Sequence, residues 1–326
     1  MISIRSTGVF VLGAALASCA RSHAPAAPAR AAPPAATAAA AGAAPPGAAT
    51  EGSPFITDSA DGVHIEYSVY GHGDPAIVLI HGWACNAGFW RNQIGPLAAK
   101  YTTVTLDLAG HGGSGRNRTD WSMARFGGDV AAVVRQLPNR RIILVGHSMG
   151  GPVALEAAPL IGPRLVGIIG IDTFRRIGLP PPQKAALEKQ VAPFRADFVG
   201  TMHRFVPQLF TRRADPHIVR LVADEMARVP PQIAIASLES LNTVDFAPLL
   251  ARIRVPIVAI DSDIQEPPNV IRVHRTVPDF SLVVVPGDGT FLMLEDPQRF
   301  NPVLLAKIAG LAGARAPAGG AGQARP

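Results

Sequence analysis

The sequence predicts a doubly wound α/β domain, and three features of its hydrophobic pattern support this. Short apolar runs recur along the chain, and most are continuous rather than alternating, as in parallel strands covered on both faces. Segments with helical spacing, such as residues 126–137, separate these runs. One interval, residues 173–242, has no strand pattern. This alternation favours a mostly parallel sheet with helices on both faces and one helical insertion.

The expected strands lie on both sides of that interval. Residues 63–69 alternate apolar and polar side chains, as a strand of an edge hairpin does. The expected buried strands are residues 76–80, 103–106, 142–145, 165–171, 257–260 and 282–285. We therefore expect a core domain built from residues 54–172 and 243–312.

Residues 173–242 predict a helical lid on this core. The segment starts near three prolines at 180–182 and continues with helical stretches that contain Phe and Met. Most of these apolar side chains should pack the lid onto the core, and some should line the pocket between the two. Because the lid offers few charges, the expected substrate is a small apolar molecule.

The N-terminus predicts export. Arg5 precedes an apolar run at residues 8–16, and small residues follow, which is the layout of a secretory signal peptide over residues 1–18. The run is too short to span a bilayer. Leu16-Ala17-Ser18-Cys19 also resembles the bacterial lipobox, in which Cys19 becomes the lipidated first residue. The alternative is an ordinary signal peptide with an incidental cysteine.

Two flanking segments are low in complexity. Residues 19–53 are almost entirely Ala, Pro and Gly and predict a flexible tether, and residues 313–326 predict a disordered tail of similar composition. A lipid anchor, a tether and a globular domain together predict a lipoprotein of the bacterial cell envelope that faces the periplasm. The two cysteines, Cys19 and Cys85, are not expected to form a disulfide.

The charge pattern argues against nucleic-acid binding. The formal net charge is +6, of which residues 1–54 carry +2, and no block of Lys or Arg occurs. A modest excess of this kind is typical of a solvated basic surface.

Ser148 is the candidate nucleophile. It lies in Gly146-His147-Ser148-Met149-Gly150, directly after the strand at 142–145 and before an apolar helix. A sharp strand-to-helix turn raises such a serine, and small flanking residues let the backbone pass. The helix N-terminus behind it favours negative charge at the reacting centre.

A second segment predicts the oxyanion hole. Acyl transfer needs two backbone N–H donors, one from the residue after the nucleophile and one from a loop that follows an earlier strand. Met149 and Trp83 stand at those positions, since His81-Gly82-Trp83 follows the strand at 76–80. His81 is expected to order this loop rather than to act as a base.

These two motifs and the glycine-rich loop at residues 107–115 give the chain its resemblance to a known family. From about residue 60 to residue 312 it resembles the α/β-hydrolase superfamily, in the branch of lidded serine esterases, haloperoxidase-like and carbon–carbon bond hydrolases. The resemblance implies a mostly parallel eight-stranded sheet, a lid and a Ser…Asp…His triad in that order. It implies no metal and no organic cofactor. Relatives with an aspartate nucleophile are set aside because Ser148 holds that position.

The remaining triad positions are less regular. The acid should follow the strand at 257–260, where Asp261 and Asp263 both stand; we prefer Asp263, because the family's acid lies a few residues past the strand. The histidine should follow the last strand, but that position reads Thr290, and no histidine occurs after His274. A threonine hydroxyl cannot serve as a general base near neutral pH.

Three hypotheses follow. The chain is a serine hydrolase of an ester or related acyl bond, in which a lid histidine, His203 or His217, or Asp288 acting through water replaces the missing base. Alternatively, it is a catalytically inactive binding protein that keeps the pocket, or a variant of an ordinary hydrolase altered at one position. Family membership favours an enzyme of the hydrolase class, impaired by the missing histidine.

Overall fold

A computed structural model describes residues 54–266 and 268–313 of the chain. They form an eight-stranded sheet in the order β1-β2-β4-β3-β5-β6-β7-β8. The first two ladders, β1 with β2 and β2 with β4, are antiparallel, and all others are parallel. The strands are β1 (Phe55–Asp58), β2 (His64–Tyr70), β3 (Ala76–Ile80), β4 (Thr102–Leu106), β5 (Ile142–His147), β6 (Leu165–Ile171), β7 (Ile257–Ser262) and β8 (Phe280–Val285).

The sheet confirms the predicted fold class and corrects one detail. The seven expected strands all occur, and the central strands β3, β4 and β5 are buried along their whole length, as continuous apolar runs require. The resemblance implies eight strands, and the eighth is β1, which the hydrophobic pattern did not locate. It pairs with β2 and forms the edge of the sheet, so the strand at 63–69 is the inner member of the hairpin.

Helices cover both faces of the sheet. Helix α1 contacts β4 and α11 contacts β6, whereas α2 contacts β1 and β2, and α3 contacts β3, β5 and β6. Helix α2 packs against α3, and α1 packs against α11. The core helices are α1 (Arg91–Ala98), α2 (Met123–Gln136), α3 (Gly150–Ile161), α8 (Phe246–Leu250), α9 (Val270–His274), α10 (Leu292–Glu295) and α11 (Pro297–Gly313). Short 3₁₀ turns are η1 (Ala87–Trp90), η2 (Gly162–Arg164) and η3 (Phe174–Arg176).

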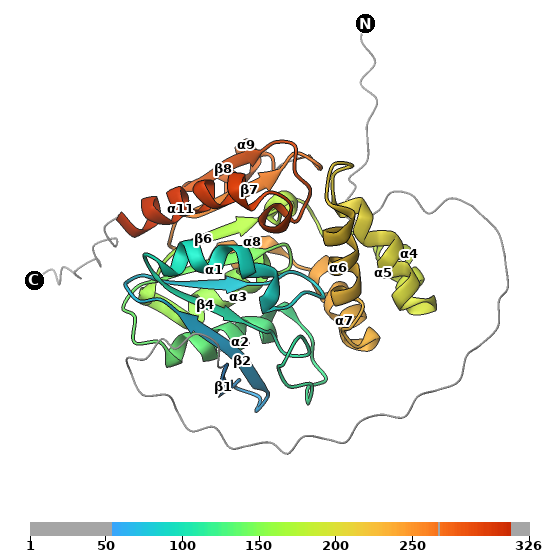
Figure 1. Cartoon of the computed structure of the whole chain (residues 1–326), viewed down its shortest axis with the longest axis horizontal. Coiled ribbons are helices and arrows are strands. Elements are labelled where there is room, and N and C mark those ends of the chain that lie inside the picture. Colours follow the sequence, from blue (N-terminus) through green and yellow to red (C-terminus); the bar gives the residue numbers. More distant parts are fainter. Residues whose placement is uncertain (1–53, 267, 314–326) are drawn as a thin grey trace, which may run out of the picture.

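A helical insertion connects β6 to β7, in the interval that lacks a strand pattern. Its helices gather beside one end of the sheet domain, on the right of Figure 1. They are α4 (Lys184–Ala196), α5 (Phe198–Phe205), the 3₁₀ turn η4 (Val206–Leu209), α6 (Pro216–Met226) and α7 (Pro231–Asn242). Buried Val191, Met202 and Ala234 pack this insertion into the core cluster.

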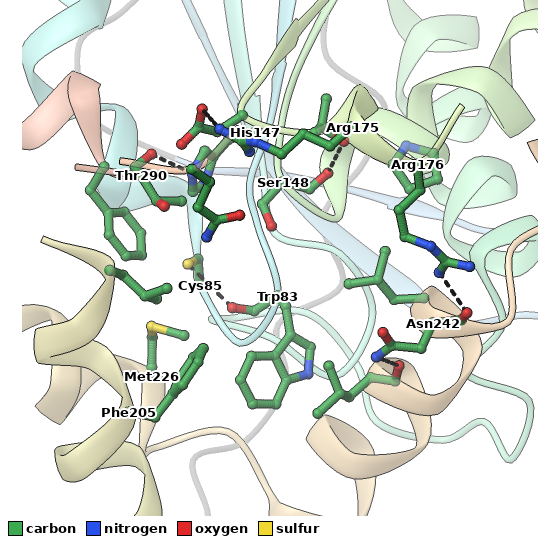
Figure 2. A pocket seen from close by; sticks show the side chains of 18 of the residues that line it. Trp83, Cys85, His147, Ser148, Arg175, Arg176, Phe205, Met226, Asn242 and Thr290 are labelled. Carbon is green, nitrogen blue, oxygen red and sulfur yellow. Dashed lines mark hydrogen bonds and ion pairs between the residues drawn. The ribbon is translucent and has the colours of Figure 1, made fainter. Parts of the chain in front are cut away.

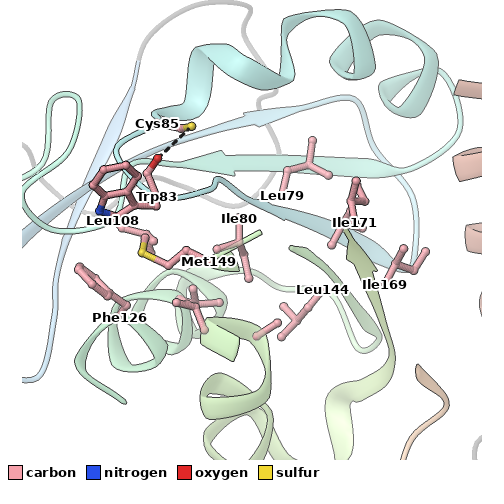
Figure 3. Packing of buried hydrophobic residues seen from close by; sticks show 14 of the residues in the cluster. Leu79, Ile80, Trp83, Cys85, Leu108, Phe126, Leu144, Met149, Ile169 and Ile171 are labelled. Atoms are coloured by element: carbon pink, nitrogen blue, oxygen red, sulfur yellow. Dashed lines mark hydrogen bonds between the residues drawn. The ribbon is translucent and has the colours of Figure 1, made fainter. Parts of the chain in front are cut away.

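One large apolar core runs between the sheet and its helices. Figure 3 shows a part of it, in which Met149 lies among Ile80, Leu108 and Phe126. Because Met149 directly follows the candidate nucleophile, its packing in the core holds the backbone beside that serine in place. Among the described residues, no helix is both long and apolar enough to span a bilayer. Cys19, the signal peptide, the tether and the C-terminal tail lie outside the described residues.

Candidate active site

Ser148 stands on a sharp turn between β5 and α3. Its φ is 49°, in the left-handed region that residues with a side chain rarely adopt. The turn is held by two hydrogen bonds, from Ser148 N to Ile171 O at 2.9 Å and from Gly151 N to Ser148 O at 3.0 Å. The side chain therefore points out of the sheet and into a pocket at the carboxyl edge of the strands.

The glycines on either side of Ser148 are required by close backbone contacts. A Cβ at Gly146 would lie 2.2 Å from Gly150 O, and a Cβ at Gly150 would lie 2.4 Å from Ile80 O of β3. Any larger residue at either position would have to displace backbone. These contacts explain why both positions next to the turn are glycine, as the sequence motif predicts.

The backbone N–H groups of Trp83 and Met149 have no hydrogen-bond acceptor among residues 54–266 and 268–313. Neither residue belongs to a strand: Trp83 lies in the loop after β3, and Met149 caps α3. These are the two donors that the sequence predicts for an oxyanion hole. The Trp83 indole is held separately, because its Nε1–H donates to Ala234 O of α7 at 2.7 Å.

His81 orders the loop that carries Trp83. Its Nε2 accepts from Leu108 N at 3.1 Å, so that Nδ1 carries the proton and donates to Gly82 O at 2.8 Å. Burial lowers the pKa of His81 to about 4, which keeps the ring neutral at pH 7. Both ring nitrogens are engaged in the loop, and the ring is not free to take a proton from Ser148.

Ser148 and Thr290 line the same pocket, which has a volume of about 110 Å³ (Figure 2). This is slightly less than the ~150 Å³ cavity that holds benzene in an engineered core. The wall is mostly apolar, with a few polar groups. Its residues are Trp83, Cys85, His147, Ser148, Pro152, Asp172, Thr173, Arg175, Arg176, Phe205, Leu209, Met226, Leu238, Leu241, Asn242, Phe246, Gln265, Thr290 and Phe291.

Thr290 is fixed through its backbone. Thr290 N donates to Leu209 O at 2.7 Å, and Thr290 O lies 3.0 Å from His147 Nε2. The side chain is 8% exposed, and its Oγ1 has no hydrogen-bond partner among the described residues. A threonine hydroxyl cannot act as a base near neutral pH.

His147 is the one histidine among the described residues that line the pocket. Since Nε2 faces the Thr290 carbonyl, it carries the proton and donates. Burial lowers the pKa of His147 to about 4, with smaller opposing contributions from Asp172 and from the Thr290 carbonyl. A group with so low a pKa is a weak general base at neutral pH.

The two aspartates expected near the acid position differ in their surroundings. Asp263 is exposed, and its Oδ1 accepts from Gly287 N at 2.8 Å, three residues before Thr290. It braces this turn and does not line the pocket. Asp261 is fully buried within β7, and neither of its oxygens has a hydrogen-bond partner among the described residues. Burial, the dominant cause, raises the pKa of Asp261 to about 7.

The carboxylate that does line the pocket is Asp172, which sequence reasoning missed. It follows β6 with a φ of 50° and is held by three donors. Ser262 N and Ser262 Oγ each donate to it at 2.7 Å, and the Arg175 guanidinium donates at 2.6 Å. Its position after a strand was a usable signal, but the lid was expected to begin there.

Gln265 and Arg176 also line the pocket and had no sequence signal. Gln265 stands two residues beyond Asp263, in a segment with no regular pattern. Arg176 belongs to the η3 turn, at the start of the interval read as lid. Only the fold brings these side chains to Ser148.

The three candidate substitutes for the missing base do not line the pocket. His203 is exposed and pairs with Asp224 at 3.4 Å over a separate surface depression. His217 is exposed in the first turn of α6. Asp288 is buried and accepts from Arg299 at 2.6 Å, and burial raises its pKa to about 6. His203 and His217 are therefore not placed to take a proton from Ser148 directly, and Asp288 is paired with Arg299.

The comparisons with known proteins agree with this geometry. The sequence model of a family described as the alpha/beta hydrolase family matches residues 77–303, which is most of the chain. The chain belongs to this family. It is thus an α/β-fold hydrolase by family membership, as the motifs around Trp83 and Ser148 predict. Among the described residues, no cluster of three or more His, Cys, Asp or Glu side chains could hold a metal.

Individual relatives are distant. A pimeloyl-[acyl-carrier protein] methyl ester esterase of Yersinia enterocolitica is 28% identical over 73% of this chain and 95% of its own. A bromoperoxidase from Bacillus anthracis superposes with a TM-score of 0.71 at 21% identity, over 79% of this chain and all of that chain. A thermophilic esterase from Thermogutta terrifontis gives 0.70 at 22% identity, over 80% and 100%. At these identities the two structures show the shared fold.

Proposed function

We propose that this protein hydrolyses an ester or related acyl bond of a small substrate, with Ser148 as nucleophile, and that the absence of a histidine at position 290 makes it slow. The observation that carries the proposal is the strained φ of 49° at Ser148, on a turn that opens into a pocket. Backbone strain of this kind persists where the surrounding structure enforces it, and it clusters at functional sites.

The proposed reaction has two steps. Ser148 Oγ attacks the acyl carbon, the oxyanion is stabilised by the N–H groups of Trp83 and Met149, and the bond to the alcohol breaks. Water then attacks the acyl-enzyme, releases the acid and restores the serine. In each step a proton must pass between the attacking and the leaving oxygen. Since Thr290 cannot carry it, this proton must travel through water.

The rate of hydrolysis should be much lower without the histidine of the triad. Enzymes that lose a member of the triad keep about a 10³–10⁴-fold rate enhancement from the oxyanion hole and binding alone. The activity expected here is therefore of that order over the uncatalysed reaction. Several relatives are named as esterases, including the Yersinia protein, which supports an ester as the bond that is cleaved.

A fluorophosphonate probe tests the proposal directly, because it reacts with an activated serine in an oxyanion hole. We expect slow labelling of the unaltered protein and none of Ser148→Ala. Labelling that persists in Ser148→Ala would assign the reaction to another residue. No labelling after prolonged incubation would favour the second candidate function.

That second candidate is a binding protein that has kept the pocket without turnover. The observation in its favour is the pocket wall itself, where Gln265 offers the neutral hydrogen-bonding groups of an amide. Such groups bind polar ligands but move no protons. A weak enzyme would be labelled slowly by the probe, whereas an inert binder would bind a ligand without being labelled.

We also propose that the protein is exported and attached to a membrane through a lipid on Cys19. Support comes from the Leu16-Ala17-Ser18-Cys19 pattern and the Ala/Pro-rich stretch at 19–53. A tether of this composition would hold the hydrolase domain away from the bilayer while leaving its pocket open to small molecules.

A further inference from the structure

Arg176 is a buried cation without a carboxylate partner. Only 8% of its surface is exposed, yet its hydrogen bonds go to two backbone carbonyls, Asn242 O at 2.7 Å and Pro180 O at 3.2 Å. No acidic side chain within residues 54–266 and 268–313 forms an ion pair with it. The carboxyl end of α7 supplies partial negative charge through Asn242, but not a full counter-charge.

Arg118 shows how the same chain treats a buried arginine elsewhere. Arg118 is 9% exposed and is paired with two carboxylates, Asp61 at 2.9 Å and Asp129 at 2.6 Å. Buried charges are normally paired in this way, because removal from water is costly. Arg176 has no such carboxylate partner, and it lines the same pocket as Ser148.

No charge already in the pocket offsets Arg176. The one carboxylate among the described lining residues is Asp172, and it is engaged by Arg175 and by both donors of Ser262. Burial keeps His147 neutral at pH 7. The pocket therefore carries about one unpaired positive charge. A guanidinium has five N–H donors, and the two carbonyl bonds of Arg176 leave others free for a ligand.

The apolar part of the pocket lies beside this cation. Figure 2 shows Arg176 and Thr290 on opposite sides of Ser148, with Trp83, Phe205 and Met226 below. A ligand in the pocket can thus meet the guanidinium at one end and the serine hydroxyl part-way along, while apolar side chains contact it from below.

We propose that the substrate of this pocket carries a carboxylate that Arg176 binds, as in the half-ester of a short dicarboxylic acid. This inference rests on the proposed function for the identity of the ester, and it replaces the purely apolar substrate expected from the lid. A carboxylate supplies the missing counter-charge, and a guanidinium binds it with paired N–H donors.

The test uses binding rather than turnover, so it separates this inference from the proposed hydrolysis. Monomethyl glutarate and dimethyl glutarate differ in one carboxylate, and both are titrated by calorimetry into Ser148→Ala, which cannot cleave them through Ser148. We expect the monoester to bind tighter by about tenfold or more, because a guanidinium binds a carboxylate more strongly than it binds a neutral ester.

Variants then assign the preference to Arg176. In the Ser148→Ala protein, Arg176→Gln should remove the preference for the monoester, Arg176→Lys should keep part of it, and Arg135→Gln, an exposed arginine on α2, should change nothing. The comparison of the two esters on Ser148→Ala itself does not depend on how well the Arg176 variants fold.

Three outcomes would overturn the inference: equal affinity for the two esters, a preference that survives Arg176→Gln, or binding of neither ester. A protein that fails to hydrolyse any ester but still prefers the monoester would contradict the proposed function alone. One that cleaves both esters at equal rates and shows no binding preference would contradict the inference alone.

Discussion

Position 290, where the sequence resemblance predicts a histidine, carries a threonine. Thr290 lines the pocket with Ser148, and its Oγ1 has no hydrogen-bond partner among the described residues. The backbone bonds to Leu209 and His147 that hold this position do not depend on the threonine side chain. A histidine placed there should therefore find the same support.

We expect Thr290→His to raise the rate of hydrolysis of a small aryl ester by about a hundredfold to ten-thousandfold, the usual value of general acid–base assistance. Steady-state assays of the two proteins measure the gain, and Ser148→Ala in the Thr290→His background should abolish it. A variant that folds but gains nothing would indicate that the acid is missing as well. That result would fit a pocket in which Asp263 braces a turn and Gln265 lines the wall.

Asp261 gives a second prediction at this scale. Burial raises its pKa to about 7 in the folded protein, against 3.8 for an ordinary aspartate. Between these two values the folded state binds more protons than the unfolded state, so its contribution to stability is present below pH 4 and is lost as the pH rises towards 7. Asp261→Asn removes this loss. The stability of the variant relative to the unaltered protein should therefore increase from pH 4 to pH 7, by up to about 1.4 kcal/mol per pH unit.

Urea denaturation at several pH values measures this difference. Asp279→Asn, at an exposed aspartate, serves as the control and should show no such trend. A constant difference between Asp261→Asn and the unaltered protein across this range would show that Asp261 ionises normally.

The candidate site could be predicted from sequence only in part. Ser148, Trp83 and Met149 belong to local motifs whose geometry depends on a few neighbouring residues. Asp172 and Arg176 come from the segment after β6 and Gln265 comes from the segment after β7, and only the packing of β6 and β7 brings them together. Sequence proximity also misled, because Asp263 is close to Gln265 in the chain but braces the Gly287 turn instead.

Among the elements, the hairpin β1–β2 and helix α2 are joined by a buried polar network. Asp129 of α2 accepts from Ser59 Oγ at 2.7 Å and from the Arg118 guanidinium at 2.6 Å and 3.0 Å. Arg118 also binds Asp61 of the hairpin turn. The network fixes the edge of the sheet to the helix that covers it, where the apolar contact is limited by the short strand β1.

Asp129→Ala should lower the free energy of unfolding by about 3–5 kcal/mol, because it leaves Arg118 buried with one partially exposed partner. Denaturant titration measures the loss. The matched control is Asp120→Ala, which removes an exposed ion pair with Arg125 at 3.0 Å and should cost less than about 1 kcal/mol. Equal losses in the two variants would contradict the importance of the network.

The elements were more predictable than the site. The continuous apolar runs that became β3 to β7 report burial on both faces, which depends on the sheet as a whole and leaves a strong pattern. The run in β8 was expected to be buried too, but β8 is an edge strand and is partly exposed. Strand β1 left no such pattern, because it has four residues with alternating exposure and Ile56 is 49% exposed. β1 is a strand because it pairs with β2. Such pairing between two segments cannot be read from the pattern of four residues.

For the molecule as a whole, the lipid anchor is the main prediction. If Cys19 is lipidated, the unaltered protein should be found in the membrane fraction of the producing cell, and Cys19→Ala should be released or remain unprocessed. Cell fractionation followed by mass analysis of the N-terminus distinguishes these outcomes. A protein that is already in the soluble fraction with an unmodified N-terminus would leave an ordinary exported hydrolase.

The position of Trp83 has a consequence for measurement. It is one of three tryptophans, and the other two, Trp90 and Trp121, are buried away from the pocket. Its ring meets Phe194 and Phe205 of the insertion edge-on, and its indole is bound to Ala234. With Trp90→Phe and Trp121→Phe in place, the remaining emission should come from the pocket wall alone. The wavelength and intensity of this emission would then change as a ligand enters or as α4, α5 and α7 shift. Trp83 fluorescence would therefore report ligand binding without an added label.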